Sequence, residues 1–168
     1  MKVMNGGRFA LLSTVLIALL FFYPPRPAFI ITTSPSMPRG LYHIDYIVPP
    51  KRGDIIVFKL PSAIEEEMGT RSWFQRGVKY VKKIGALTGD KLCVTDTAMT
   101  VNGTVTLPLF LTDQEGTPLP QPTKGCSYVG HYEFLPLSTH FPRSFDGRYY
   151  GPLKLSLIEG VATLIFHL

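Results

Sequence analysis

The hydrophobic and polar positions of the chain follow two different patterns, and the change lies near residue 25. Residues 9–23 (FALLSTVLIALLFFY) form one apolar run without a charge, and Pro24-Pro25 ends it. Beyond this point the apolar residues fall into short runs that glycine and proline separate. Short apolar or alternating runs bounded by such turn residues are typical of β-strands. The pattern therefore predicts an apolar N-terminal segment followed by a mainly β domain.

Several stretches of the second part have the composition of strands and lie close together along the chain. The predicted strands are residues 54–60 (DIIVFKL), 77–87 (GVKYVKKIGAL), 131–137 (HYEFLPL) and 154–168, with a hairpin built from 91–96 and 98–107. Asn102-Gly103 is expected at the turn of this hairpin, because Asn-Gly is favoured in two-residue hairpin turns. Short strands in succession favour an antiparallel sheet.

Residues 61–77 interrupt this pattern with the acidic run Glu65–Glu67 and the aromatic pair Trp73-Phe74. A short helix, a lid or membrane-contacting loop, and a solvated insertion are all compatible with this composition. We assign no chemistry to the stretch.

Residues 9–25 are predicted to be an uncleaved transmembrane anchor. The apolar run is shorter than the roughly 20 residues of a usual span, so the core of a cleaved signal peptide is the alternative. Arg26 favours the anchor, because it stands two residues before Ala28, where a cleavage site requires a small residue. Lys2 and Arg8 would hold residues 1–8 in the cytoplasm. Residues 26–168 would then form a domain outside the cytoplasm, on the far side of a membrane that the chain crosses once.

Composition and charge narrow the classes of protein to consider. The chain has 168 residues, of which 45% are hydrophobic and 17% charged, and these values fit one domain with a core and argue against disorder. The net charge of +5 raises the possibility of nucleic-acid binding. The basic residues are scattered rather than gathered into a stripe, so no nucleic-acid partner is expected. Attraction to an anionic membrane surface fits the charge better.

The two cysteines, Cys93 and Cys126, are predicted to form a disulfide, because an even number of cysteines in an exported domain is typical of such bridges. Two buried free thiols are the alternative. A bridge over this separation would stabilise the fold by roughly 3–4 kcal/mol in the chain-entropy account. No Cys-x-x-Cys is present and the four histidines are dispersed, so neither a metal site nor a cofactor is predicted.

The stretch TTSPSMPRGLY, residues 32–42, contains the first candidate for chemistry. Pro35 and Pro38 restrict the backbone on both sides of Ser36, and Gly40 permits a sharp bend. Such a turn can hold a hydroxyl group outward. A serine is a weak nucleophile without a base, and most loop serines are structural. None of the four histidines lies in a recognisable triad context.

Lys82 is the candidate for that base. Side chains alternate along a strand, so Lys82 shares a face with Tyr80 and Ile84, whereas Lys83 points to the other face beside Lys79. Burial disfavours a charged amine and lowers its pKa, and a neutral amine can accept a proton from a serine. The alternative is that the side chain reaches out to water.

Ser144, Asp146 and Arg148 alternate in the stretch PRSFDGRYYG. In an extended segment this spacing places all three on one side, where an Asp–Arg pair beside a hydroxyl group could brace a site. A surface turn is the alternative, because Asp-Gly is a common turn pair.

Taken together, these stretches resemble the conserved boxes of the type I signal peptidases, the Ser/Lys proteases. The resemblance covers about residues 32–151, and its boxes occur in the family's order: SPSM with a following proline, RGD before an apolar strand, YVKKIGALTGD, a VNG turn and SFDGRYYG. Within the family, SMPRGLY is most similar to the TraF-type peptidases of conjugative plasmids. The small size, the two cysteines and residues 116–130 also fit that branch.

The resemblance implies a role for each matching residue. Ser36 matches the nucleophile and Lys82 the general base. Ser34 matches the hydroxyl that forms the oxyanion hole with the backbone N–H of Ser36. Ser144 matches the hydroxyl that orients the lysine amine.

Asp146 and Arg148 match the supporting pair near the site, and in the TraF branch an aspartate of this region is implicated in activity. The substrate is expected to bind in an extended form, against Ile31, Thr32, Thr33 and Met37. Two departures weigh against a housekeeping secretory role and leave the catalytic pair untouched. Arg39-Gly40 replaces a threonine of the general pattern, and residues 137–143 (LSTHFPR) replace a Gly-Asp-Asn-Arg-Asp run.

The resemblance implies a signal-peptidase-like antiparallel β domain after a single N-terminal transmembrane helix. The helix would lie in the lipid of a bacterial inner membrane, with residues 26–168 in the periplasm. Its expected activity is that of a membrane-anchored serine endopeptidase that removes signal, leader or terminal peptides from exported precursors. The expected substrate in the TraF branch is a membrane-bound conjugative pilin, whose product can be cyclised. The conjugative transfer apparatus is an expected partner.

Two alternatives stay open. One is a general type I signal peptidase that acts on many signal-peptide-bearing precursors. The other is a non-catalytic periplasmic assembly factor of a conjugative pilus or secretion system, in which Ser36 and Lys82 would be incidental. The joint presence of these two residues, with Ser34 and Ser144 at the family positions, favours the enzyme.

Overall fold

The computed structural model describes residues 11–14 and 26–168. The anchor predicted for residues 9–25 therefore lies outside the described residues, except for residues 11–14, which are helical. Within these ranges, no helix has both the length and the apolar character that crossing a membrane requires. The anchor and the limits drawn at residues 8 and 25 stay predictions.

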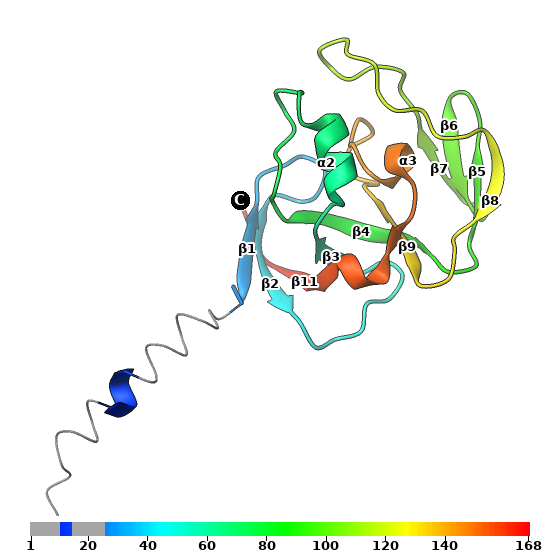
Figure 1. Ribbon diagram of the computed structural model, residues 1–168. Coiled ribbons are helices and arrows are strands. Elements are labelled where there is room, and N and C mark those ends of the chain that lie inside the picture. Colours follow the sequence, from blue (N-terminus) through cyan, green and yellow to red (C-terminus); the bar gives the residue numbers. More distant parts are fainter. Residues whose placement is uncertain (1–10, 15–25) are drawn as a thin grey trace, which may run out of the picture.

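The domain consists mainly of short antiparallel strands, as the sequence predicted (Figure 1). In chain order the elements are β1 (Phe29–Thr32), β2 (Gly40–Asp45), β3 (Ile55–Phe58), α2 (Ser62–Met68), β4 (Tyr80–Leu87), β5 (Lys91–Val94), β6 (Ala98–Val101), β7 (Val105–Pro108), β8 (Gly125–Tyr128), β9 (Glu133–Leu137), α3 (Gly147–Tyr150), β10 (Leu153–Lys154), the 3₁₀ turn η1 (Leu155–Leu157) and β11 (Ile158–His167).

Two sheets divide these strands. The larger has seven strands in the order β1-β2-β11-β3-β4-β9-β10, and the smaller has four in the order β7-β6-β5-β8. All described strand pairs are antiparallel. Figure 1 shows the small sheet at the opposite end of the domain from β1 and β2. β1 is an edge strand of the large sheet, since it pairs with β2 alone.

The central strands of the large sheet are buried on both faces. On β3, Ile56 and Phe58 belong to the main core, whereas Val57 between them belongs to a second, smaller core on the other face. β4 alternates in the same way, with Ile84 in the main core and Val81 in the second. Each such buried aliphatic side chain contributes roughly 1.5–3 kcal/mol. Side chains of β4 therefore alternate between the main-core face and the second-core face, and Lys83 on the latter face reaches solvent.

The predicted hairpin of residues 91–107 forms two hairpins rather than one. Asn102-Gly103 lies at a turn as predicted, with φ of 51° and 69°, and joins β6 to β7. A separate turn joins β5 to β6, where Thr95 N–H donates to the carbonyl of Ala98. The sequence hid this second turn because Thr95–Thr97 contains no glycine or proline to mark it.

Residues 61–77 begin with the short helix that was one of the predicted possibilities. Helix α2 is followed by turns that bring Trp73 and Phe74 to the body of the domain. Phe74 is buried in the main core and Trp73 donates from its indole N–H to Asp113 Oδ2 at 3.0 Å. The stretch is thus packed against the domain rather than freely solvated.

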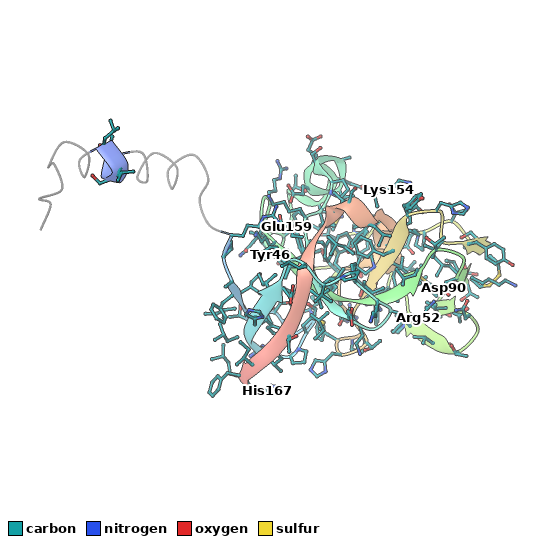
Figure 2. The ribbon with its side chains drawn as sticks, turned by 90° about the horizontal axis from the view of Figure 1, so that it is seen from below. Tyr46, Arg52, Asp90, Lys154, Glu159 and His167 are labelled. Carbon is teal, nitrogen blue, oxygen red and sulfur yellow. A yellow bond between two sulfur atoms is a disulfide. The ribbon has the colours of Figure 1, made fainter. Side chains whose placement is uncertain are left out.

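Polar contacts and one disulfide hold the small sheet in place. Arg52, in the β2–β3 loop, forms an ion pair with Asp90 at the start of β5, and Figure 2 shows these two side chains facing each other. Asp90 also accepts from Asn102 Nδ2 at 2.8 Å. The predicted disulfide joins Cys93 on β5 to Cys126 on β8, which lie directly opposite each other in the antiparallel ladder.

Candidate active site

Ser36 lies in the turn between β1 and β2, and other parts of the chain hold the backbone of this turn. Its side chain is 6% exposed. The hydroxyl of Tyr42 donates to the carbonyl of Pro38 at 2.7 Å, and the hydroxyl of Ser138 donates to the carbonyl of Ser36 at 2.5 Å. The turn is therefore fixed from both sides by side chains that are fully buried.

Gly40 serves this turn differently from the sharp bend expected of it. It begins β2, and a Cβ atom there would lie 2.1 Å from the carbonyl oxygen of Phe166 on β11. Glycine is required at this position because the two strands approach each other closely.

Ser34 lies beside the hydroxyl of Ser36. The two Oγ atoms are 3.0 Å apart, and the backbone N–H of Ser36 donates to Ser34 Oγ at 3.3 Å. A hydroxyl and a backbone N–H so close together can donate to the same incoming oxygen. This is the geometry that an oxyanion hole needs.

Lys82 projects from β4 into the main-core side of the sheet and is 5% exposed, whereas Lys83 is exposed, as the strand alternation predicted. Its amine donates to Ser144 Oγ at 2.9 Å. Burial lowers the pKa of Lys82 from 10.5 to about 8; the nearby carboxylate of Asp146 opposes this shift and the guanidinium of Arg148 adds to it. At pH 7 roughly a tenth of this amine is therefore neutral, far more than of a lysine with the ordinary pKa of 10.5.

Asp146 and Arg148 form a fully buried ion pair, with Arg148 Nε donating to Asp146 Oδ1 at 2.8 Å. The remaining N–H groups of the guanidinium reach Asp146 Oδ2 and the backbone carbonyls of Ser144, Pro142 and Pro108. All five donors of the arginine are satisfied, which is what burial of this charge requires.

The segment that carries this pair is not extended, which corrects the expectation for its geometry. Asp146 caps helix α3, and its carboxylate accepts from the backbone N–H of Arg148 at 3.1 Å. The bend forms because the Asp146 carboxylate caps the helical turn by accepting from a backbone N–H that has no partner within the helix. The carbonyl of Ser144 accepts from Arg148, and its hydroxyl accepts from Lys82. The three residues are thus linked by hydrogen bonds rather than by strand alternation.

Ser36, Lys82, Ser34 and Ser144 all line one groove of about 1030 Å³. Its other lining residues fall within 30–36, 73–75, 78–82, 110–119 and 141–149. The edge strand β1 and the start of β4 supply part of its wall. Its volume is at the upper end of the roughly 300–1,000 Å³ of ligand sites, so a short peptide segment fits beside the two serines and the lysine.

Of the residues expected to contact a substrate, Ile31, Thr32 and Thr33 line the groove. Met37 does not: it is 5% exposed and lies in the second core with Tyr42 and Val81. Met37 directly follows Ser36 but points to the other face of the sheet, whereas Ser36 lines the groove.

Lys82 and Ser36 line the same groove, but the described residues include no hydrogen bond between Nζ and Oγ. The amine donates to Ser144 and the hydroxyl pairs with Ser34. Catalytic hydrogen bonds often tighten only when substrate binds. A rotation of the Ser36 side chain away from Ser34 would free both the hydroxyl proton and the Ser34 donor.

Two features of the site could not be inferred from the sequence. Ser138 contacts the backbone of Ser36 across 102 residues of chain, and Trp73 and Phe74 line the groove from the stretch to which no chemistry was assigned. The one signal for Ser138 was its position in LSTHFPR, where the chain departs from the signal peptidase pattern.

Comparison with known proteins gives matches over most of the chain. The family described as "Signal peptidase, peptidase S26" matches residues 6–167. The plasmid transfer protein TraF of Escherichia coli is 32% identical over 141 residues, which cover 78% of each chain. The conjugal transfer protein TraF of Agrobacterium fabrum (strain C58) is 28% identical over 145 residues, or 81% of each chain. A signal peptidase I of Enterococcus faecalis V583, known from a crystal structure, is 25% identical with a TM-score of 0.42, covering 70% of this chain and 99% of that one.

Proposed function

Because the chain belongs to the signal peptidase family S26, we propose that it is a serine endopeptidase in which Ser36 and Lys82 form the catalytic dyad. One observation carries this proposal. The amine of Lys82 is buried in the groove that Ser36 also lines, hydrogen-bonded to Ser144, with its pKa lowered to about 8. A buried lysine in a cleft has little structural use, and a neutral amine is what a serine nucleophile needs.

Acylation begins when Lys82 Nζ takes the proton of the Ser36 hydroxyl as Oγ attacks the scissile carbonyl carbon. A new C–O bond forms and the carbonyl oxygen becomes an oxyanion. Ser34 Oγ–H and the backbone N–H of Ser36 donate to it, replacing the hydrogen bond that they now make with each other. One such donor lowers the barrier by about 3–4 kcal/mol in a comparable hydrolase.

The tetrahedral intermediate then collapses as the C–N bond breaks. The leaving amine takes its proton from the protonated Lys82, and the acyl group remains on Ser36 as an ester. In the hydrolytic route, Lys82 deprotonates a water molecule that attacks this ester. The C–O bond to Ser36 then breaks, Ser36 Oγ takes the proton back from Lys82, and the carboxylate product leaves. If the N-terminal amine of the substrate attacks instead, a new amide bond closes a ring, and the product is lighter than the hydrolysed one by one water.

The expected substrate is a membrane-bound precursor of a conjugative pilin. The named relatives support this choice, since they are described as plasmid or conjugal transfer proteins. An anchor in residues 9–25 would hold the catalytic domain on the periplasmic face of the inner membrane. Confining enzyme and precursor to one surface raises their effective concentration.

The test uses intact mass spectrometry on two precursors, each expressed with the full-length chain. One is the major pilin precursor of a conjugative plasmid, and the other is a secretory precursor with an Ala-x-Ala cleavage site. The variants are Ser36→Ala and Lys82→Ala, with Lys83→Ala as the matched control. Lys83 is an exposed lysine one position along the same strand.

We expect the wild type and Lys83→Ala to shorten the pilin precursor, and both dyad variants to leave it at full length. A further loss of about 18 Da would indicate cyclisation through attack of an amine on the acyl-enzyme. If only the secretory precursor is processed, the pilin proposal is wrong and the chain acts as a general type I signal peptidase. Processing by Ser36→Ala or Lys82→Ala would rule out the dyad and favour the assembly factor.

A further inference from the structure

Ser138 has a place in the structure that the catalytic scheme above does not use. It is fully buried and follows directly after β9. On β9, Leu137 pairs with Lys83 of β4 and Pro136 with Ile84. Ser138 is the next residue beyond the pair of Leu137 and Lys83, as Lys82 is on β4. Continuing the register by one residue places Ser138 at the level of Lys82.

The hydrogen bonds of Ser138 run toward the nucleophile on one side and the supporting pair on the other. Its hydroxyl donates to the backbone carbonyl of Ser36 at 2.5 Å and accepts from the N–H of Phe141 at 3.2 Å. Its own N–H donates to Asp146 Oδ2 at 2.9 Å. Both hydrogen-bonding capacities of the hydroxyl are thereby used, and its donor is directed at the nucleophile turn.

We propose that Ser138 is a positioning residue that sets the distance between the Ser36 nucleophile and the Lys82 base. The turn of Ser36 belongs to the β1–β2 connection, whereas Lys82 belongs to β4, which is separated from β2 in the sheet by β11 and β3. Ser138 hydrogen-bonds the backbone of the Ser36 turn and itself lies just beyond the end of β9, at the level of Lys82 on β4. This inference rests on the proposed Ser36–Lys82 dyad.

The alternative is that Ser138 only closes the turn that ends at Phe141. The two roles differ in what they predict for kinetics. Ser138 does not line the groove, so substrate binding should not depend on its hydroxyl. Loss of the contact to Ser36 shifts the nucleophile, and a shift of about 1 Å can lower a rate by roughly a hundredfold. A role confined to the turn would lower stability and leave the rate of each folded molecule unchanged.

The experiment measures kcat, KM and thermal unfolding for full-length protein in detergent. The variants are Ser138→Ala, Ser138→Thr, which keeps the hydroxyl, and Thr139→Ala, whose side chain is exposed. The substrate is whichever of the two precursors named above the wild type cleaves. Wild type and Ser36→Ala are measured in parallel, because cleavage by Ser36→Ala, or none by the wild type, would overturn the dyad and this inference with it.

With the dyad intact, we expect Ser138→Ala to lower kcat by roughly 10- to 100-fold with KM within about twofold of the wild type. Ser138→Thr should recover most of this loss, and Thr139→Ala should match the wild type. If folded Ser138→Ala has a kcat within twofold of the wild type, the role of Ser138 is overturned and the proposed dyad is not affected. If Ser138→Ala does not fold, Ser138→Cys, with its weaker donor, takes its place under the same criterion.

Discussion

At the scale of single residues, one position along β4 separates two chemically different lysines. Lys82 is buried against Ser144, whereas Lys83 is exposed. Successive side chains of the strand point to opposite faces, so Lys82 lies on the main-core side, whereas Lys83 lies on the other face and reaches solvent. Burial then shifts the proton equilibrium of Lys82 toward the neutral amine.

The pH dependence of cleavage should follow Lys82. The base works when neutral, so kcat/KM should be low at pH 6 and rise through a pKa of about 8 to a plateau. An unperturbed lysine would move that rise to about 10.5. Measurement from pH 6 to 10 on full-length protein distinguishes the two, and Lys83→Ala should leave the profile unchanged. A flat profile would contradict the role of Lys82.

The same burial has a cost in stability that Lys82→Met should remove. Below pH 8 the unfolded lysine keeps its proton, and the folded one must either bury a charge or lose it. Lys82→Met should therefore be inactive and unfold at a higher temperature than the wild type at pH 6. As the pH rises toward 10.5 this advantage should shrink, because the unfolded lysine then loses its proton too. An equal difference in unfolding temperature at pH 6 and pH 10 would contradict this account.

At the scale of elements, the features that depend on local pattern could be predicted and those that depend on distant contacts could not. The strands β3, β4 and β9 followed from their apolar runs, and Asn102-Gly103 marked its turn. A turn at Asp146 was only the alternative to an extended segment and was expected at the surface, because alternate spacing alone does not distinguish a buried cap from a strand. Ser138 and Trp73 were missed because their partners lie far away in sequence.

The disulfide stabilises one element pair, β5 and β8, away from the groove. Replacing both cysteines by alanine should lower the free energy of unfolding by about 2–4 kcal/mol. The kcat/KM of the folded variant should equal that of the wild type, since neither cysteine lines the groove. Thermal unfolding measures the loss of stability, and the precursor assay measures kcat/KM. The wild type in reductant should behave like the variant in both measurements. A loss of activity in folded protein would show that the small sheet shapes the site.

At the scale of the whole molecule, Arg148 joins the two sheets at the site. Its guanidinium binds the carbonyl of Pro108 at the end of β7, at 2.7 Å, as well as Asp146 and Ser144 beside Lys82. The position of Ser144, and through it that of the lysine amine, therefore depends on the packing of both sheets.

Arg148→Ala should destabilise the protein by about 3–5 kcal/mol, because it leaves a buried carboxylate without its partner. Arg148→Lys should be nearly as harmful, since an ammonium group cannot reproduce the five directed donors. Arg143→Ala serves as the control for stability and should change it little, because Arg143 is exposed. Thermal unfolding measures all three. A well-folded Arg148→Lys with wild-type stability would show that charge alone is enough at this position.

The edge strand β1 has a consequence for where a precursor is cut. An edge strand has a free row of backbone N–H and C=O groups, and Ser36 follows only four residues after its end at Thr32. If a precursor pairs with β1, the backbone hydrogen bonds fix its register, and the register decides which peptide bond lies at Ser36. A slip of one residue would turn every side chain to the wrong face, whereas a slip of two restores the faces. Minor products should therefore differ from the main one by two residues in mass spectra, and equal amounts of products one residue apart would exclude this mode of selection.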